Sequence, residues 1–304
     1  MVLQQRLREI FELTSHATTE PTQTAIPNVL VIKGEVPAHQ LAAVYEPMIG
    51  FLVQGGKTIS IGEQEIKLIP PSYFVIPTET PATGRVFQGK NGEPYLSVAL
   101  RLHHEMLHSL LNDLPRSVQE RGASGELSSC PATPEFVDAW VRMLRLLKTP
   151  RDIPALAPAY EREILYRVLS GPQGWRLIRA CLEKGKASKI RQAVLWIREN
   201  YSKNIDVQKV ASKSGMAVTT FHRRFKEITG LSPIQFQKQL RLLEARKLLV
   251  FSDSSVADTA FEVGYESPSQ FNREYSRFFG ASPARDASNL RKLEIDRESF
   301  AKGS

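Results

Sequence analysis

The feature that most constrains this chain is a repeat in its C-terminal part. Residues 207–233 (VQKVASKSGMAVTTFHRRFKEITGLSP) and 256–283 (VADTAFEVGYESPSQFNREYSRFFGASP) carry small, aromatic, basic and turn residues at matching places. Phe221 and Phe271 match at an offset of 50, whereas Gly215 and Gly264 match at an offset of 49. Self-similarity of this kind predicts two copies of one supersecondary unit that differ by one residue in a turn.

Each copy has the pattern of two helices joined by a sharp turn. Gly215 and Gly264 lie where the first helix must stop, a place suited to a residue that tolerates positive φ. The second helix of each copy carries aromatic residues four positions apart, which indicates one buried face. Helix, glycine-containing turn and helix together form the helix-turn-helix signature. We therefore predict two such units, at about 207–228 and about 255–278.

The buried face of each second helix determines its exposed face, because successive residues rotate by about 100°. Arg223 lies between Phe221 and Phe225 in the sequence and points outward, and Arg273 has the same position in the other copy. Arginine reads guanine and Gln or Asn reads adenine in the major groove. His222 is also consistent with an ordinary surface histidine. The predicted base contacts are Thr219, His222, Arg223, Ser269, Gln270, Asn272 and Arg273, and the predicted phosphate contacts are Lys213, Arg224, Lys226 and Arg277.

The segment 232–249 between the two units is a strong helix former. A helix of this length spans about 27 Å at about 1.5 Å per residue. That length suits two reading helices placed in successive major grooves, which are about 34 Å apart on one face of DNA. One chain would then contact two adjacent half-sites.

The charge of the chain is concentrated in the same region. The net charge is +8, and residues 184–304 hold 22 Lys and Arg against 13 Asp and Glu, whereas residues 1–183 hold 18 against 19. A basic domain beside a neutral one is typical of a chain that binds a polyanion through one domain. A solvated basic surface without a partner is the alternative on charge alone.

The N-terminal part shows a different pattern. Short runs rich in Val, Ile, Phe and Tyr between 28 and 102 predict strands, with Gly55-Gly56 as a tight hairpin, and their spacing suggests a small barrel or sandwich. Helical periodicity follows at 103–114, 134–148, 156–171 and 174–185, with a polar loop at 117–133. We expect a linker at 183–189 and a frayed polar tail at 288–304.

The stretch from about 189 to 287 resembles the DNA-binding domain of the AraC/XylS family of bacterial regulators, through FHRRFKEITGLSP and GYESPSQFNREYSRFFGASP. The resemblance implies seven helices in two helix-turn-helix units, with base contacts on the outward residues predicted above. Pro268 departs from the family pattern, because a polar side chain often reaches a base at that position. The segments 44–64, 94–102 and 161–174 are similar to an AraC-type sensing domain, which implies a cupin-like barrel for an effector, then helices that pair subunits.

These patterns give an α+β chain of two main domains. The expected parts are a sensing and dimerisation domain at 1–182 (barrel about 20–102, helices about 103–182), a linker at 183–189, a DNA-binding domain at 190–287 and a tail at 288–304. We predict a cytoplasmic, nucleoid-associated, sequence-specific transcription regulator without membrane segments. Its expected partners are double-stranded DNA, a small-molecule effector, a second copy of the chain, and RNA polymerase if it activates.

Catalytic and cofactor chemistry finds little support. None of the six histidines falls within 44–100, although His104 and His108 form an i, i+4 pair beside Glu105. No nucleophile–base grouping or phosphate-cradling loop is evident, so we predict no enzyme, metal or cofactor. Two alternatives stay open. One is a repair methyltransferase delivered by similar helices, which would need a reactive, metal-held cysteine cluster that the two distant cysteines do not provide. The other is an architectural protein that coats DNA without sequence preference.

A ligand pocket inside the barrel is the favoured use of the N-terminal domain. Candidate pocket residues are Tyr45, Phe51, Tyr73 and Phe87, although residues of these types are more often part of a plain core. Cys130, in an expected loop, is either a redox or electrophile sensor or a spectator thiol. Subunits are expected to pair through the amphipathic helices between Tyr160 and Leu182.

Overall fold

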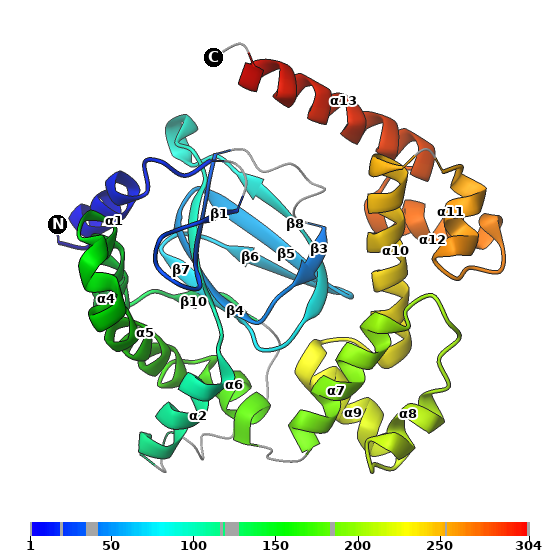
Figure 1. The fold of residues 1–304 in the computed structure, drawn as a ribbon, viewed down its shortest axis with the longest axis horizontal. Coiled ribbons are helices and arrows are strands. Elements are labelled where there is room, and N and C mark those ends of the chain that lie inside the picture. Colours follow the sequence, from blue (N-terminus) through cyan, green and yellow to red (C-terminus); the bar gives the residue numbers. More distant parts are fainter. Residues whose placement is uncertain are drawn as a thin grey trace.

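The computed structural model describes residues 2–18, 21–34, 42–115, 118, 128–182, 186–252 and 254–302. A β-sheet unit with helices on one side forms the N-terminal part, and helices alone form the C-terminal part (Figure 1). The predicted α+β class with two domains is therefore confirmed. Within the described residues, no helix is long and apolar enough to cross a membrane.

The strands form two antiparallel sheets. The larger sheet has the order β1-β2-β9-β4-β7-β10 and the smaller sheet the order β3-β8-β5-β6. Apolar side chains from both, such as Leu52, Phe74 and Ile59, pack in one buried cluster between them. Of the barrel or sandwich that the strand spacing suggested, the structure has two packed sheets, and the cupin-like barrel that the resemblance implied is not closed. The strands are β1 (Thr22–Gln23), β2 (Val29–Lys33), β3 (Ala43–Tyr45), β4 (Met48–Gln54), β5 (Gly56–Ile61), β6 (Gln64–Leu68), β7 (Ser72–Ile76), β8 (Thr80–Phe87), β9 (Leu96–Arg101) and β10 (Cys130–Pro131).

Gly55 marks the corner between the two sheets and not the predicted hairpin. β4 pairs with β7 and β9, whereas β5 pairs with β6 and β8 in the other sheet. Gly55 has a φ of +82°, and a Cβ there would lie 2.6 Å from the carbonyl oxygen of Phe87. Only glycine fits this backbone conformation and this close approach, so the residue turns the chain from one sheet into the next.

Helices cover the outer face of the larger sheet (Figure 1). Phe51 of β4 meets Phe136 with ring centroids 5.3 Å apart, and the fully buried Trp140 lies beside them. These helices place the second apolar core of the N-terminal unit outside the space between the sheets. They are α1 (Val2–Leu13), α2 (His104–Asp113), α4 (Pro134–Arg145), α5 (Ile153–Leu169) and α6 (Gly174–Leu182), with 3-10 turns at Lys90–Gly92, Leu146–Lys148 and Pro150–Asp152.

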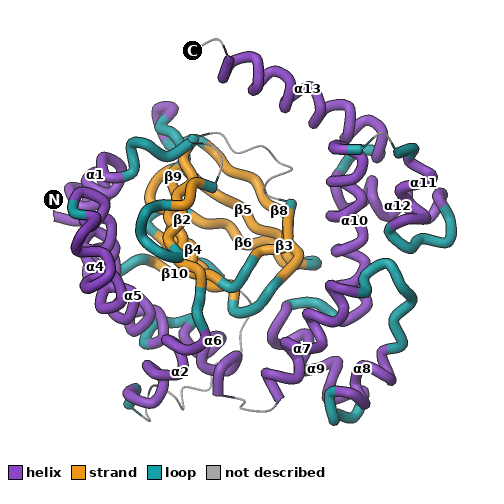
Figure 2. The backbone as a smooth tube through the Cα atoms, viewed as in Figure 1, coloured by secondary structure: helices purple, strands orange, loops and turns teal. Residues whose placement is uncertain are grey.

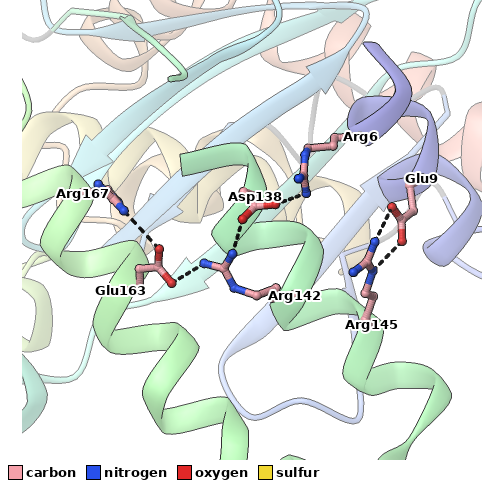
Figure 3. Close-up of polar contacts among 7 residues, drawn as sticks. All are labelled: Arg6, Glu9, Asp138, Arg142, Arg145, Glu163 and Arg167. Atoms are coloured by element: carbon pink, nitrogen blue, oxygen red, sulfur yellow. Dashed lines mark hydrogen bonds and ion pairs between the residues drawn. The ribbon is translucent and has the colours of Figure 1, made fainter. Parts of the chain in front are cut away.

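Ion pairs tie α1, α4 and α5 to one another (Figure 3). Two nitrogens of Arg145 on α4 lie 2.7 and 3.0 Å from the carboxylate of Glu9 on α1, and this arginine lowers the pKa of Glu9. Arg142 on α4 bridges Asp138 and Glu163 of α5. The α1 helix is therefore held on the helical layer by charge as well as by its buried leucines. The chain of charges ends at Arg6 and Arg167.

The C-terminal helices are arranged around the long α10, which runs beside β3 and β8 (Figure 2). One helix-turn-helix unit lies at each end of α10 (Figure 2). The described residues of the C-terminal part form seven helices, the number that the resemblance implies. They are α7 (Lys186–Glu199), α8 (Val207–Lys213), α9 (Val218–Thr229), α10 (Pro233–Phe251), α11 (Val256–Glu262), α12 (Pro268–Phe279) and α13 (Pro283–Lys302).

The structure bears differently on three local predictions, which concern the polar tail, the polar loop and the linker. The tail expected to be frayed is helical as far as Lys302, because α13 continues through it. Most of the predicted polar loop at 117–133, namely residues 117 and 119–127, lies outside the described residues. Residues 183–185 of the expected linker also lie outside them, and α7 begins at Lys186.

Candidate nucleic-acid interface

The first helix-turn-helix unit consists of α8 and α9. Asp206 caps α8 by accepting hydrogen bonds from the backbone N–H groups of Gln208 and Lys209 at 3.0 and 3.2 Å. The turn passes through Gly215, whose φ is +60°. Phe221 and Phe225 of α9 are fully buried. These features hold α9 firmly against its own unit and leave its opposite face to solvent.

The second unit repeats this construction with α11 and α12. Ser255 caps α11 by accepting a hydrogen bond from the N–H of Asp258 at 3.1 Å. Gly264 has a φ of +91°, and Phe271 and Tyr275 of α12 are fully buried. The turn is one residue longer than in the first unit, as the shift of offset predicted. Pro268 is the first residue of α12, a position where its missing N–H costs nothing.

The predicted base contacts lie on the two reading helices, α9 and α12. Five of the seven are exposed, namely Thr219, Arg223, Ser269, Asn272 and Arg273. His222 and Gln270 are half-buried. His222 packs near the ring of Phe221, and the amide of Gln270 donates a hydrogen bond of 3.2 Å to Glu274. The arginines at equivalent positions thus project from both helices, whereas Gln270 is already engaged.

The four predicted phosphate contacts are less uniform. Lys226 is exposed, and the ammonium of exposed Lys213 lies 5.7 Å from the ring centroid of Trp196. Arg224 has a side chain that is 21% exposed and pairs with Glu227 at 3.5 Å. Arg277 is exposed but lines a cleft between the smaller sheet and the C-terminal helices. Lys213 and Lys226 are therefore the better placed pair for phosphates.

The long connector α10 anchors both units. Ser232 and Gln235 form a capping box at its first turn. Near its other end, Arg246 is buried and donates hydrogen bonds of 2.8 and 2.9 Å to Asp286 of α13. The hydroxyl of Tyr275 donates a third hydrogen bond to Asp286, at 2.8 Å. This buried cluster fixes α12 on α10 and so sets the direction of the second reading helix.

The first unit also packs against the β-sheet unit. The turn after α9 meets the turn between β5 and β6, so that a Cβ on Gly62 would lie 2.7 Å from the side chain of Leu231. Arg198 of α7 pairs with Glu79 at 2.5 Å. Between α6 and α9, Arg179 pairs with Glu227 at 2.9 Å. Apolar and charged contacts together join the first reading helix to the N-terminal unit.

The four predicted pocket residues fall in different places. Phe51 and Tyr73 are partners across β4 and β7 and both face the helical layer, so they lie outside the space between the sheets. Tyr45 lies in the cluster between the sheets, and Phe87 is half exposed beside a cleft. Side chains alternate between the faces of a strand, and the sequence does not say which face points inward.

Sequence reasoning missed a buried lysine on β5. Lys57 is 4% exposed, and its ammonium lies 5.2 Å from the ring centroids of both Tyr45 and Phe74. Burial lowers the pKa of Lys57 to about 8. The signal was present, because Lys57 continues the inward-facing alternation of Ile59 and Ile61.

The structure gives little support to a thiol sensor at Cys130 or to a metal site at the histidines. Cys130 belongs to β10 and is 1% exposed, which corrects its assignment to a loop. Burial raises the pKa of Cys130, so the reactive thiolate is disfavoured. The side chain of His104 lies outside the described residues, as does His39. Among the side chains that are described, no three metal-ligating groups come together.

Comparisons with known proteins cover both parts of the chain. A model of the AraC-type transcriptional regulator N-terminus matches residues 25–176, which is half of the chain, and a helix-turn-helix domain model matches residues 210–288. The HTH-type transcriptional activators RhaS of Citrobacter koseri and Salmonella schwarzengrund are each 33% identical over 135 residues, or 43% of this chain. That match spans 46% of each relative, so the chain covers about half the length of these proteins.

Solved structures of ToxT from Vibrio cholerae share the fold across both domains. One form has a TM-score of 0.54 at 8% identity and covers 85% of this chain and 97% of ToxT. The form with a bound unsaturated fatty acid has a TM-score of 0.52 at 11% identity, with 85% and 92% covered. At such low identity the likeness concerns the fold. The two family models, each on its own part, carry the assignment: the chain belongs to the AraC/XylS family of helix-turn-helix transcription regulators.

Proposed function

We propose that the protein reads a defined DNA sequence with α9 and α12 and regulates transcription from it. The observation that carries this proposal is the matched exposure of Arg223 and Arg273 on two duplicated helices whose opposite faces are buried. Thr219, Ser269 and Asn272 are exposed on the same helices and complete the base-reading set, with His222 and Gln270 in half-buried positions. An arginine that is bidentate to guanine is the commonest specific base contact.

Phosphate contacts would set the register of the protein on DNA. Lys213 and Lys226 are exposed near the first reading helix and fit this role. Arg277 fits it if the cleft that it lines opens on DNA, and Arg224 fits it if its pairing with Glu227 exchanges for a phosphate. The basic excess of residues 184–304 supports the same assignment.

The N-terminal unit, at about 1–182, would control the DNA-binding unit, at about 190–287, in response to a small molecule. One buried apolar cluster runs from Ile59 and Ile61 of β5 to Ile228 and Leu231 beside the first reading helix. A ligand that shifts β5 would therefore favour some placements of α9 over others. ToxT, which has the same fold, has been solved with an unsaturated fatty acid bound, and this supports an effector here.

Activation and dimer formation complete the proposal. The RhaS relatives are named activators, which supports contact with RNA polymerase.

Leu156 and Tyr166 on α5 are each 40% exposed and offer an apolar face for a second copy of the chain. Light scattering of the full chain should show a dimer that Tyr166→Asp weakens. A monomer at micromolar concentration for the unaltered chain would count against pairing.

Selection of binding sites from random duplex DNA tests the DNA-reading proposal. The full-length chain should enrich a site with two half-sites about one helical turn apart. Arg223→Ala and Arg273→Ala should each weaken binding to that site by about 1–3 kcal/mol, each at a different half-site. Arg151→Ala removes the same charge from the N-terminal unit, where Arg151 is exposed, and should leave affinity unchanged.

The outcome separates this function from its rivals. Equal binding to all sequences, with affinity that follows salt alone, would favour an architectural protein. Equal losses at both half-sites from either arginine substitution would show that the two helices do not read separate sites.

A further inference from the structure

The space between the two sheets contains a cation without a counter-charge. Lys57 is 4% exposed, and its ammonium lies 5.2 Å from the ring centroids of Tyr45 and Phe74. Among the described residues, no carboxylate pairs with it. A cation–π contact offsets only part of the free energy that burying an unpaired charge costs. Lys57 is thus costly to the folded chain as it stands.

A second hydrogen-bond donor in the same place also lacks an acceptor. The hydroxyl of Tyr45 is buried and makes no hydrogen bond with the described residues. Tyr45 comes from β3 of the smaller sheet and Phe74 from β7 of the larger, so Lys57 reaches across the gap between the sheets. A buried hydroxyl and a neighbouring ammonium, neither with an acceptor among the described residues, indicate a site for an oxygen anion.

An opening connects Lys57 with solvent. A cleft of about 1200 Å³ lies at the corner between the sheets, beneath α1, and Lys57 and Leu68 are among its lining residues. Both side chains also belong to the interior between the sheets. The apolar part of the lining includes Leu7, Val53 and Phe87. Its charged residues are Arg8, Lys57, Glu65, Lys67, Lys90 and Glu93, an excess of two cations.

We propose that Lys57 and Tyr45 bind the carboxylate of a small organic acid whose apolar body lies in the cleft beneath α1. The proposal rests on the effector control proposed above and names the chemical class of the effector. One ammonium and one hydroxyl suit a singly charged carboxylate better than a phosphate dianion, because the neighbouring side chains are apolar. Gly50 makes room for this arrangement, since any Cβ there would overlap the ring of Phe74.

The site is also joined to the DNA-binding unit. Lys57 precedes Ile59 and Ile61 on the same strand, and Ile61 lies in the cluster that contains Leu231. An acid that neutralises Lys57 acts on the strand whose far end meets the turn after α9. Binding of the acid and binding of DNA are therefore coupled through β5.

Calorimetric titration of the full chain with decanoate and with decan-1-ol, below micelle-forming concentrations, tests the site. The two probes share the apolar body and differ in the carboxylate. Decanoate should bind at least about tenfold more tightly, and Lys57→Met should abolish that difference. Lys67→Met is the matched control, because exposed Lys67 lines the same cleft, and it should change affinity by less than about twofold.

Two further arms sharpen the test. Tyr45→Phe should weaken decanoate binding while leaving decan-1-ol unaffected. Affinity of the unaltered chain for decanoate should fall as the pH rises from about 7 to about 9, because Lys57 loses its charge over this range. Equal binding of acid and alcohol, or unchanged decanoate binding by Lys57→Met, would overturn the carboxylate site.

Parallel titration with the selected DNA keeps the two proposals apart. The unaltered chain and Lys57→Met should both bind this DNA, and decanoate should change the DNA affinity of the unaltered chain but not that of Lys57→Met. Failure to take up decanoate with DNA binding intact overturns the acid site alone. Absence of any selected DNA site counts against the proposed function instead.

Discussion

Both domains bury cations, and two of them, Arg246 and Lys57, have different surroundings. Arg246 in the helical unit is 7% exposed and meets Asp286, which also accepts a hydrogen bond from Tyr275. Lys57 in the β-sheet unit is 4% exposed and meets only aromatic faces. The buried charge of Arg246 has its hydrogen-bond partners and so stabilises one arrangement of the helices. The buried charge of Lys57 has no counter-charge among the described residues, and it stays unfavourable until an anion binds. The comparison separates a structural interior from a binding interior.

Removing the counter-charge of Arg246 should have the largest effect. Asp286→Ala leaves a buried guanidinium and the Tyr275 hydroxyl without their acceptor, and should cost about 3–5 kcal/mol of the stability of the helical unit. Denaturant unfolding followed by Trp fluorescence and circular dichroism measures it. Glu244→Ala is the matched control, because Glu244 forms its ion pair with exposed Lys247 on the same helix. A loss of stability below about 1 kcal/mol for Asp286→Ala would mean that Arg246 does not depend on its counter-charge, and the contrast with Lys57 would then fail.

Removing the other cation should have the opposite sign. Lys57→Met keeps the length and apolar stem of the side chain and removes an unpaired buried charge, so it should raise stability by about 1–2 kcal/mol. Thermal unfolding of the ligand-free chain measures the change. A destabilised Lys57→Met would mean that the contacts with Tyr45 and Phe74 outweigh the burial of the charge, and the contrast between the domains would fail.

The pH dependence of stability should show the same contrast more finely. The pKa of Lys57 is lowered to about 8 in the folded chain, below its ordinary value of 10.5. Between these values the unfolded chain binds more protons, so folding gains stability as the pH rises. The advantage of Lys57→Met over the unaltered chain should therefore shrink from pH 8 towards pH 10. Paired denaturant titrations measure this difference, and a gap that stays constant with pH would contradict a buried, charged Lys57.

Most of the helical unit was predictable from the sequence because its signals are local. Gly215 and Gly264 have the positive φ that their place in the repeat demanded, and the phenylalanines four apart are buried as the periodicity required. The exposed side of α9 and α12 followed from that buried side. What the sequence did not show was the engagement of Gln270 by Glu274, because that contact depends on the rotamers of two side chains.

The β-sheet unit was harder because its decisive contacts are distant in the chain. Strand β6, with the sequence QEIKL, escaped notice because its polar residues lower strand propensity, and only its pairing with β5 makes it a strand. Gly55 looked like a hairpin residue because a sheet corner uses the same positive φ. Phe51 and Tyr73 were placed in the pocket because no local rule says which face of β4 and β7 the helices cover.

An exposed ion pair between the two domains should have the smallest effect and completes the series. Arg198 and Glu79 lie 2.5 Å apart, with side chains 51% and 18% exposed. Water screens such a pair, so Arg198→Ala should cost only about 0.2–1 kcal/mol of stability, an effect that about 1 M salt removes. Chemical unfolding at low and high salt measures both values. A loss of stability well above this range that persists in salt would show that the Arg198–Glu79 pair is shielded from water in solution. This pair would then be a structural ion pair, like that of Arg246 with Asp286. A small, salt-sensitive loss leaves the interface easy to rearrange, which is what control of α9 by the β-sheet unit requires.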